Sequence, residues 1–190
     1  MPKILTLRIT LKDMRPSIWR KIEIDDSMNF EDLHYVIQAL MGWEDDHLYC
    51  FNIGKNTTID GDRVERGSFF PFFGKRREYL KACSAVLASF IKKEGDKFLY
   101  TYDFGDNWEV ELIVKSISPK KKGQKRAVCL SGKRSGPPED CGGIFMYSDA
   151  TEVLKDKNHP HYQELSEWYG EDFDPEYFNI EQVNKRLENY

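Results

Sequence analysis

The chain opens with two runs in which apolar and polar residues alternate, over 4–12 and 18–24. Alternation at a period of two places the apolar side chains on one face, which predicts two half-buried strands. Between the runs Pro16 breaks the pattern, because proline fixes φ and donates no backbone hydrogen bond. We therefore expect a β-hairpin at the start of the chain.

A helical period follows the hairpin. Apolar residues over 30–41 recur on one helical face, with Asn29 and Asp32 placed for a capping box and Gly42 placed to end the helix. Residues 47–53 predict a third strand. The order strand–strand–helix–strand indicates an α+β fold with a β-grasp-like ββαβ start, in which the helix packs across a sheet.

The middle of the chain predicts that the sheet is mainly antiparallel. The runs 97–104 and 108–114 alternate on either side of Gly105-Asp106-Asn107, which is typical of a hairpin, and 126–130 fits an edge strand. A short helix is expected within 84–92. Residues 54–77 are interpreted as a long excursion without an assigned structure, and they carry an aromatic patch of Phe69, Phe70, Phe72 and Phe73.

The end of the chain predicts helices with an acidic surface. Residues 139–190 hold thirteen Asp and Glu against four Lys and Arg, a balance of −9, although the net charge of all 190 residues is only −4. We expect one domain over residues 1–190, in which 143–190 form a helical C-terminal extension packed on the rest. Its helices are expected near 147–157, 160–169 and 179–189.

The basic residues gather between Leu112 and Pro138, where eight Lys and Arg occur without an acid. Such a run can meet phosphates, so it supplies candidate nucleic-acid contacts. The alternative is a solvated loop whose charge the acidic C-terminal region offsets, and the isoelectric point of 5.7 favours that alternative. The candidate contacts are Lys120, Lys121, Lys122, Lys125 and Arg126.

Composition excludes several classes of protein. The longest apolar runs fall far short of the roughly 18–20 residues that span a bilayer, and the N-terminal residues lack the apolar block of a signal peptide. We expect a soluble, cytoplasmic protein without a membrane partner. The four cysteines form no CxxC pair, so a zinc finger is not expected, and without a secretion signal a disulfide framework is not expected either.

Two short segments concentrate the chemistry. Asp103-Phe104-Gly105-Asp106 precedes Trp108, and Pro137-Pro138 stiffen a loop that carries Glu139, Asp140 and Cys141. If the two segments meet, their carboxylates are candidate ligands of a divalent metal ion, since like charges at close range need a cation or raised pKa values. In the structural alternative, Gly105 takes a positive φ and Asp103 or Asp106 bonds turn amides. The candidate site is Asp103, Asp106, Trp108, Glu139, Asp140 and Cys141, with Asp103, Asp106, Glu139 and Asp140 as weak candidate metal ligands.

Histidines and tryptophans are assigned structural roles. His34 and His47 could form a composite zinc site with Cys129 or Cys141, but no local spacing supports it, and a lone histidine is more often a hydrogen-bonded structural residue. Trp108 shares a strand face with apolar residues, so a core position is favoured over base stacking.

Four segments, taken together and in order, carry a resemblance. They run from Arg15 to Arg20, from Leu33 to Phe51, over Tyr100-Thr101-Tyr102-Asp103-Phe104-Gly105-Asp106-Asn107-Trp108-Glu109, and from Cys129 to Gly143. In this arrangement the chain resembles the plasmid pRiA4b ORF-3-like family over nearly its whole length. The resemblance implies an α+β fold in a functionally uncharacterised family whose relatives are linked with mobile elements. The family commonly has histidine where this chain has Val110, which argues against histidine chemistry at that position.

Two functions from different classes follow, and a regulatory protein that acts through its acidic C-terminal helices is a third possibility. The favoured hypothesis is a non-enzymatic binding module, with nucleic acid or another protein as partner and a possible link to mobile-element biology. The alternative is a divalent-metal-dependent hydrolase or nuclease-like enzyme that uses the carboxylates of Asp103, Asp106, Glu139 and Asp140 to activate water. The sequence assigns no catalytic residue, so it leaves open whether the protein is an enzyme.

Overall fold

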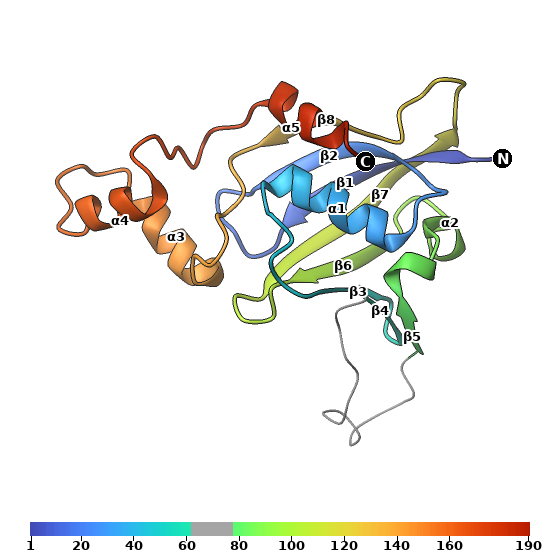
Figure 1. Cartoon of the computed structure of the whole chain (residues 1–190), viewed down its shortest axis with the longest axis horizontal. Coiled ribbons are helices and arrows are strands. Elements are labelled where there is room, and N and C mark those ends of the chain that lie inside the picture. Colours follow the sequence, from blue (N-terminus) through green and yellow to red (C-terminus); the bar gives the residue numbers. More distant parts are fainter. Residues whose placement is uncertain (62–77) are drawn as a thin grey trace, which may run out of the picture.

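The computed structural model describes residues 1–61 and 78–190. Within these residues the expected α+β fold is confirmed: one eight-stranded sheet, in the order β5-β4-β3-β6-β7-β1-β2-β8, is accompanied by helices (Figure 1). The strands are β1 (Lys3–Leu11), β2 (Trp19–Asp25), β3 (Tyr49–Ile53), β4 (Thr57–Asp60), β5 (Glu78–Lys81), β6 (Lys97–Tyr102), β7 (Trp108–Pro119) and β8 (Ala127–Lys133).

The sheet is mixed, which corrects the expectation of a mainly antiparallel sheet. β5 pairs with β4 in parallel, whereas the other neighbours are antiparallel. The parallel pair runs from Thr57 opposite Glu78 to Asp60 opposite Lys81. The expected aromatic patch at Phe69, Phe70, Phe72 and Phe73 lies outside the described residues.

The first hairpin forms where the alternation predicted it. β1 pairs antiparallel with β2, from Ile4 opposite Asp25 to Thr10 opposite Trp19. The other edge of β1 pairs with β7, so β1 is a central strand whose apolar face is buried. β3 does not lie beside this hairpin, because β6 and β7 separate it from β1.

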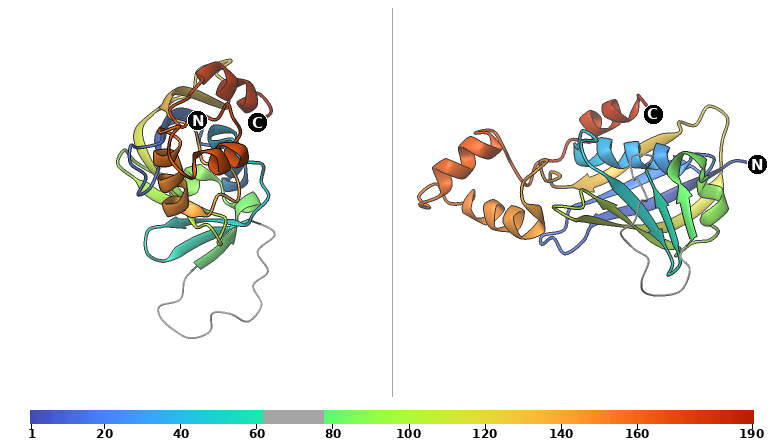
Figure 2. Two further views of the ribbon diagram at one scale, coloured as in Figure 1. Left: turned by 90° about the vertical axis from the view of Figure 1, so that its left-hand side faces the viewer. Right: turned by 60° about the horizontal axis from the view of Figure 1, so that its bottom comes forward.

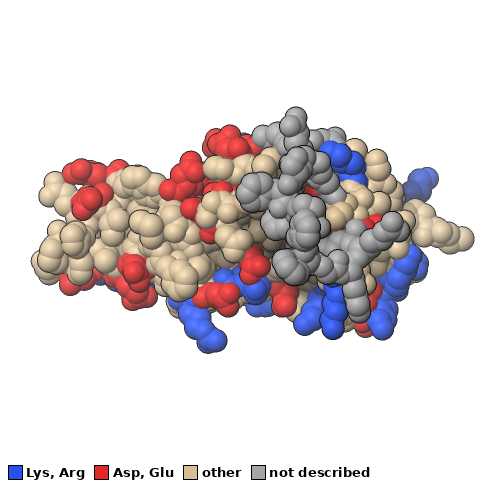
Figure 3. Space-filling model, turned by 90° about the horizontal axis from the view of Figure 1, so that it is seen from below, with Lys and Arg blue, Asp and Glu red and all other residues tan. Residues whose placement is uncertain are grey.

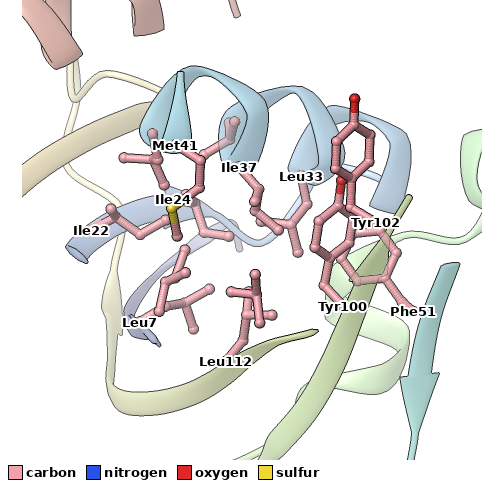
Figure 4. Packing of buried hydrophobic residues seen from close by; sticks show 14 of the residues in the cluster. Leu7, Ile22, Ile24, Leu33, Ile37, Met41, Phe51, Tyr100, Tyr102 and Leu112 are labelled. Carbon is pink, nitrogen blue, oxygen red and sulfur yellow. The ribbon is translucent and has the colours of Figure 1, made fainter. Parts of the chain in front are cut away.

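Helix α1 (Phe30–Met41) lies across the sheet and covers the core (Figure 4). Its capping box is present, since the side chain of Asn29 accepts from the Asp32 amide and the Asp32 carboxylate accepts from the Asn29 amide. Gly42 ends the helix at φ 86°, in the left-handed region that favours glycine. The apolar face of the helix, with Leu33 and Ile37, packs against strand residues that include Leu7 and Leu112.

The remaining helices occupy three places. η1 (Ala82–Ser84) and α2 (Leu87–Phe90) lie near one end of the sheet, while α3 (Gly143–Val153) and α4 (Tyr162–Tyr169) extend beyond the opposite end (Figures 1 and 2). α5 (Ile180–Leu187) returns to pack on β8 and α1. There the side chain of Asn184 bonds the Cys129 backbone twice, accepting from its amide at 2.8 Å and donating to its carbonyl at 3.0 Å. Among the residues described, no helix is long and apolar enough to cross a bilayer.

Candidate metal centre

The turn between β6 and β7 holds the first group of candidate residues. Asp103 and Asn107 have φ values of 52° and 56°, and the backbone amide of Asn107 donates to the carbonyl of Asp103 at 2.6 Å. The carboxylate of Asp103 accepts from the Gly105 amide at 2.9 Å, as the structural alternative expected. Gly105 itself does not take a positive φ, so that part of the expectation was wrong. Aspartate and asparagine tolerate the left-handed region better than other side chains, which lets the non-glycine residues make the turn.

The Pro137–Gly143 loop docks against this turn. The indole N–H of Trp43 donates to the Pro137 carbonyl, and the Gly142 amide donates to the carboxylate of Asp106, both at 2.9 Å. Gly143 is so close to the turn that a Cβ on it would lie 2.7 Å from the Asp106 carbonyl oxygen. The two segments that the sequence singled out therefore meet at one place.

A third segment brings a histidine to the same place. His47 precedes β3, and its Nε2 lies 3.1 Å from Asp140 Oδ1 while its Nδ1 lies 3.7 Å from Asp103 Oδ1. One potential ligand atom from each of His47, Asp103 and Asp140 lies within 4.8 Å of the others. We call these three residues the metal-site cluster. A nitrogen and two carboxylate oxygens are a ligand set that suits Zn²⁺ or Mn²⁺.

Glu139 stands beside the metal-site cluster with its two oxygens in different environments. Oε1 accepts from the Tyr102 hydroxyl at 2.8 Å and from the Glu44 amide at 2.9 Å. Oε2 is buried, lies 3.9 Å from His47 Nε2, and has no hydrogen-bond partner among the described residues. Since a buried carboxylate oxygen without a partner is costly, this atom points to a ligand or water at the site.

The cluster is open on one side. The Asp103 side chain is 10% exposed, whereas that of Asp140 is 73% exposed. A cation about 2.1 Å from each ligand keeps the ligands within roughly 4.2 Å of one another, so a small side-chain adjustment closes the set. Three protein ligands with an open side leave coordination positions for water or substrate.

Three other predicted site residues serve the surrounding structure. Asp106 lies beside the cluster, but its carboxylate is used to hold the Gly142 amide. Trp108 is buried in the core, as the sequence favoured, and stands edge-on to Tyr147. Cys141 is buried, and burial together with the neighbouring Asp106 carboxylate raises the pKa of its thiol to about 12. None of these three belongs to the metal-site cluster.

The candidate nucleic-acid contacts lie far from this place. Lys120 follows the end of β7, and the turn lies before its start, so twelve strand residues separate them, about 40 Å in extended chain. Lys120 pairs with Asp25, Lys125 with Glu188 at 3.3 Å, and Arg126 with Asp32 at 2.9 Å. Lys121 and Lys122 are exposed.

His34 is a structural residue. Its ring is buried, stacks on Tyr49 at 3.6 Å between centroids, and its nitrogens lie 2.8 Å from the Tyr100 hydroxyl and 2.9 Å from Asp45 Oδ1. Burial raises the pKa of Tyr100 well above its ordinary value, so the hydroxyl stays protonated. The partners of His34 are therefore Tyr100 and Asp45, and not the Cys129 or Cys141 of the composite zinc site considered from the sequence.

His47 is the candidate ligand that sequence reasoning did not join to the carboxylates. The signal lay in strand pairing: β3 pairs antiparallel with β6, from Tyr49 opposite Tyr102 to Ile53 opposite Phe98. That register places the residues just before β3 beside those just after β6, and the Asp103 amide donates to the Leu48 carbonyl at 3.0 Å. A correct register from sequence would have brought His47 to Asp103.

Comparison with known proteins supports the resemblance that the motifs carried. Residues 3–182 match the family described as plasmid pRiA4b ORF-3-like protein. The chain belongs to this family. Within the pRiA4b ORF-3-like proteins, it is similar to the uncharacterized protein y4hQ of Sinorhizobium fredii (strain NBRC 101917 / NGR234), with 31% identity over 188 residues, 98% of this chain and 91% of the relative.

A solved structure resembles this pRiA4b ORF-3-like protein closely. The crystal structure of MM3350 from Methanosarcina mazei Go1, a protein of unknown function, matches with a TM-score of 0.83 and 36% identity. The match covers 96% of this chain and 98% of that one. The fold described above is therefore shared with MM3350 over nearly the whole of both chains.

Proposed function

We propose that this protein is a divalent-metal-dependent hydrolase whose metal ion is held by His47, Asp103 and Asp140. The observation that carries the proposal is the convergence of these three side chains from three separate segments, within 4.8 Å of one another. A metal ion held by carboxylate and imidazole ligands lowers the pKa of a bound water and polarises a carbonyl or phosphoryl oxygen.

Glu139 is the general base in this proposal. Its Oε1 is fixed by two donors, while its Oε2 is buried, free of protein hydrogen bonds, and on the side of His47. A carboxylate so placed can take the proton of a metal-bound water as the water attacks the substrate, and return it to the leaving group.

The exposure of Asp140 supports catalysis over a purely structural metal site. Structural zinc sites are closed by four protein ligands, whereas catalytic sites keep a position open. Here the cluster has three ligands, and the third is mostly exposed. The open side leaves room for a substrate.

The contacts give less support to the alternative, a binding module for nucleic acid. Of the candidate contacts, Lys120, Lys125 and Arg126 are already paired with carboxylates of this chain. An ion pair within the protein must be broken before a phosphate can take its place. The mobile-element link rests on family association alone, and three of the five candidate nucleic-acid contacts are already paired, so we favour the metal centre.

Isothermal titration calorimetry on metal-free protein tests the metal site. Zn²⁺ and Mn²⁺ are expected to bind with one site per chain, and His47→Ala is expected to abolish that binding because it removes the nitrogen ligand. His161→Ala, which removes an exposed histidine on another segment, is the matched control and should bind as the wild type does. The metal site is refuted if the wild-type protein gives no heat at millimolar ion.

Two further variants separate metal binding from hydrolysis. Glu139→Gln is expected to keep the metal but lose metal-dependent turnover of a panel of ester, phosphodiester and peptide substrates. Asp103→Asn is expected to lose both while keeping the circular-dichroism spectrum of the wild type. If Glu139→Gln retains turnover, Glu139 is not the base. If no member of the panel is hydrolysed by metal-loaded wild type, the enzyme proposal fails.

A further inference from the structure

Two of the three segments that supply the metal-site cluster expose an apolar side chain directly after the cluster residue. Leu48 follows His47, and Phe104 follows Asp103; both are exposed although they are large and apolar. The backbone amide of Asp103 donates to the Leu48 carbonyl. Leu48 and the residue after Asp103, Phe104, therefore lie on neighbouring segments beside the metal-site cluster. Two exposed apolar residues therefore adjoin the cluster along the chain, and we call them the apolar rim of the site.

The first turn of α3 continues this apolar rim. Phe145 and Met146 are 83% and 64% exposed, and they follow directly on the loop that carries Asp140. The Met146 side chain lies over Gly142, where an added Cβ would come within 2.3 Å of its sulfur atom. Since the Gly142 amide is bonded to Asp106 in the β6–β7 turn, α3 begins at the edge of the site.

The surroundings of this rim are acidic. Residues 139–190, which include α3 and α4, carry a net charge of −9. Figure 3 shows the consequence on one face: carboxylates gather over the end where α3 and α4 lie, and Lys and Arg gather at the other end. Such a field repels polyanions and attracts cations within about a Debye length, 8–10 Å at physiological salt.

Together these features select a substrate class. We propose that the site binds a polypeptide segment in which an apolar side chain stands next to Lys or Arg, and that the metal centre hydrolyses a peptide bond of that segment. The inference rests on the proposed function and adds the substrate to it. The apolar side chain contacts Phe104, Phe145 and Met146, and the basic side chain meets the surrounding carboxylates.

The chemical step balances without any further reactant. The oxygen of the metal-bound water forms a bond to the carbonyl carbon, and Glu139 takes one of its protons. The carbon–nitrogen bond then breaks, and the proton passes from Glu139 to the leaving amine. The products are a carboxylic acid and an amine, and nothing is oxidised or reduced.

Binding of three labelled peptides to the Zn²⁺-loaded protein tests the substrate class by fluorescence anisotropy. The first has Phe between two Lys, the second has Phe between two Glu, and the third has Gly between two Lys. The first peptide is expected to bind about tenfold more tightly than each of the others, which corresponds to about 1.4 kcal/mol. Its preference over the Glu peptide should shrink in 0.5 M salt, because the charges are exposed.

Variants locate the contact. Phe145→Ser combined with Met146→Ser is expected to weaken binding of the first peptide about tenfold without changing Zn²⁺ affinity. Val86→Ser, which removes an exposed apolar side chain near α2, is the matched control and should leave both unchanged. Mass spectrometry of the unlabelled peptide then shows whether the bond is cut in the wild type and spared in Glu139→Gln.

The outcomes separate this inference from the proposed function. If the protein binds Zn²⁺ but binds the three peptides with equal affinity, the proposed substrate class is wrong and the metal site is not affected. The same holds if the Zn²⁺-loaded protein binds a single-stranded oligonucleotide more tightly than the peptides. Hydrolysis of a phosphodiester but not of the first peptide leads to the same conclusion. Absence of Zn²⁺ binding overturns the proposed function, and the peptide hydrolysis fails with it.

Discussion

The hydroxyl of Tyr102 lies 2.8 Å from Glu139 Oε1 and at the same time accepts from the backbone amides of Asp46 and His47, at 3.1 and 3.3 Å. One oxygen atom therefore connects the loop that carries the histidine ligand to the carboxylate assigned as base. Burial and the hydrogen bond to Glu139 raise the pKa of Tyr102, which keeps the hydroxyl protonated as a donor at neutral pH. We propose that Tyr102 is a positioning residue for the proposed metal centre.

Tyr102→Phe is expected to weaken Zn²⁺ affinity by about tenfold or more, the usual effect of removing a group that orients metal ligands. It should lower turnover more than affinity, because Glu139 loses its orientation. Calorimetry and initial rates measure the two effects. Tyr147→Phe is the matched control, since it removes a buried hydroxyl that has no partner among the described residues. Equal Zn²⁺ affinity and turnover in Tyr102→Phe and the wild type would rule out the positioning role.

Metal binding should stabilise the folded protein. At a free Mn²⁺ concentration one hundred times the Kd, the gain in unfolding free energy is about 2.7 kcal/mol. For a chain of this length each kcal/mol raises Tm by about 2–4 °C, so differential scanning fluorimetry should show a rise of about 5–10 °C. The rise should vanish with EDTA and shrink in acid, because the imidazole and carboxylates must be deprotonated to bind metal. His47→Ala should show no rise; a full rise in this variant contradicts the assignment.

The Lys120–Asp25 pair should stabilise the fold. Asp25 is buried, and Lys120→Gln leaves its carboxylate without the cation, so the loss in unfolding free energy should be about 1–3 kcal/mol at pH 7. Urea denaturation measures it. Lys122→Gln, an exposed neighbour, is the control and should change stability by less than about 0.5 kcal/mol. If Lys120→Gln leaves the free energy of unfolding unchanged, the fold does not need Lys120 and the lysine is available for binding.

The same pair predicts a pH dependence with a definite sign. Although burial acts to raise the pKa of Asp25, its hydrogen bonds from Lys120 and Ser27 hold it below the ordinary value. A depressed carboxyl pKa contributes stability above the unfolded-state pKa of about 3.9, and the contribution is lost as the pH falls through the folded-state value. The stability difference between wild type and Lys120→Gln should therefore be full at pH 6–7 and disappear in strong acid. A difference that persists at pH 2 contradicts the ion pair as its source.

Cys141 should be chemically inert at neutral pH. Only the thiolate reacts with iodoacetamide, and a pKa of about 12 leaves almost none of it at pH 7.5. Peptide mapping after brief alkylation should find Cys83, which is exposed, modified many times faster than Cys141. In urea the two should react at similar rates. Rapid modification of Cys141 in the native protein would mean that it is available for chemistry and belongs to the working site.

Much of the fold was predictable because local signals determined it. The helix over 30–41 was expected from its period, the Asn29–Asp32 capping box and Gly42, and each of these features is present. Alternation predicted the strands of both hairpins. β4 and β5 were not predicted, since four-residue strands next to a glycine-rich stretch give a weak periodic signal and their parallel pairing depends on distant residues.

The candidate site was predicted in part, for a related reason. Proline stiffness and clustered carboxylates marked the two loops, and their meeting follows from bonds such as the one between Gly142 and Asp106. Both Asp103 and Asp106 accept a backbone amide, and turn geometry decides that only Asp103 also lies near His47, so the sequence could not tell the two apart. His47 required the strand register, which no local pattern reveals.

Asn184 has a consequence for how the protein behaves at high concentration. Its side-chain amide occupies the amide and the carbonyl of Cys129 on the outer edge of β8. An intruding strand from a neighbouring molecule would need those two groups to continue the ladder. The Asn184 side chain thus blocks strand pairing at this point of the β8 edge, which disfavours edge-to-edge aggregation there. Helix α5, which carries Asn184, packs on β8 and holds the side chain in position.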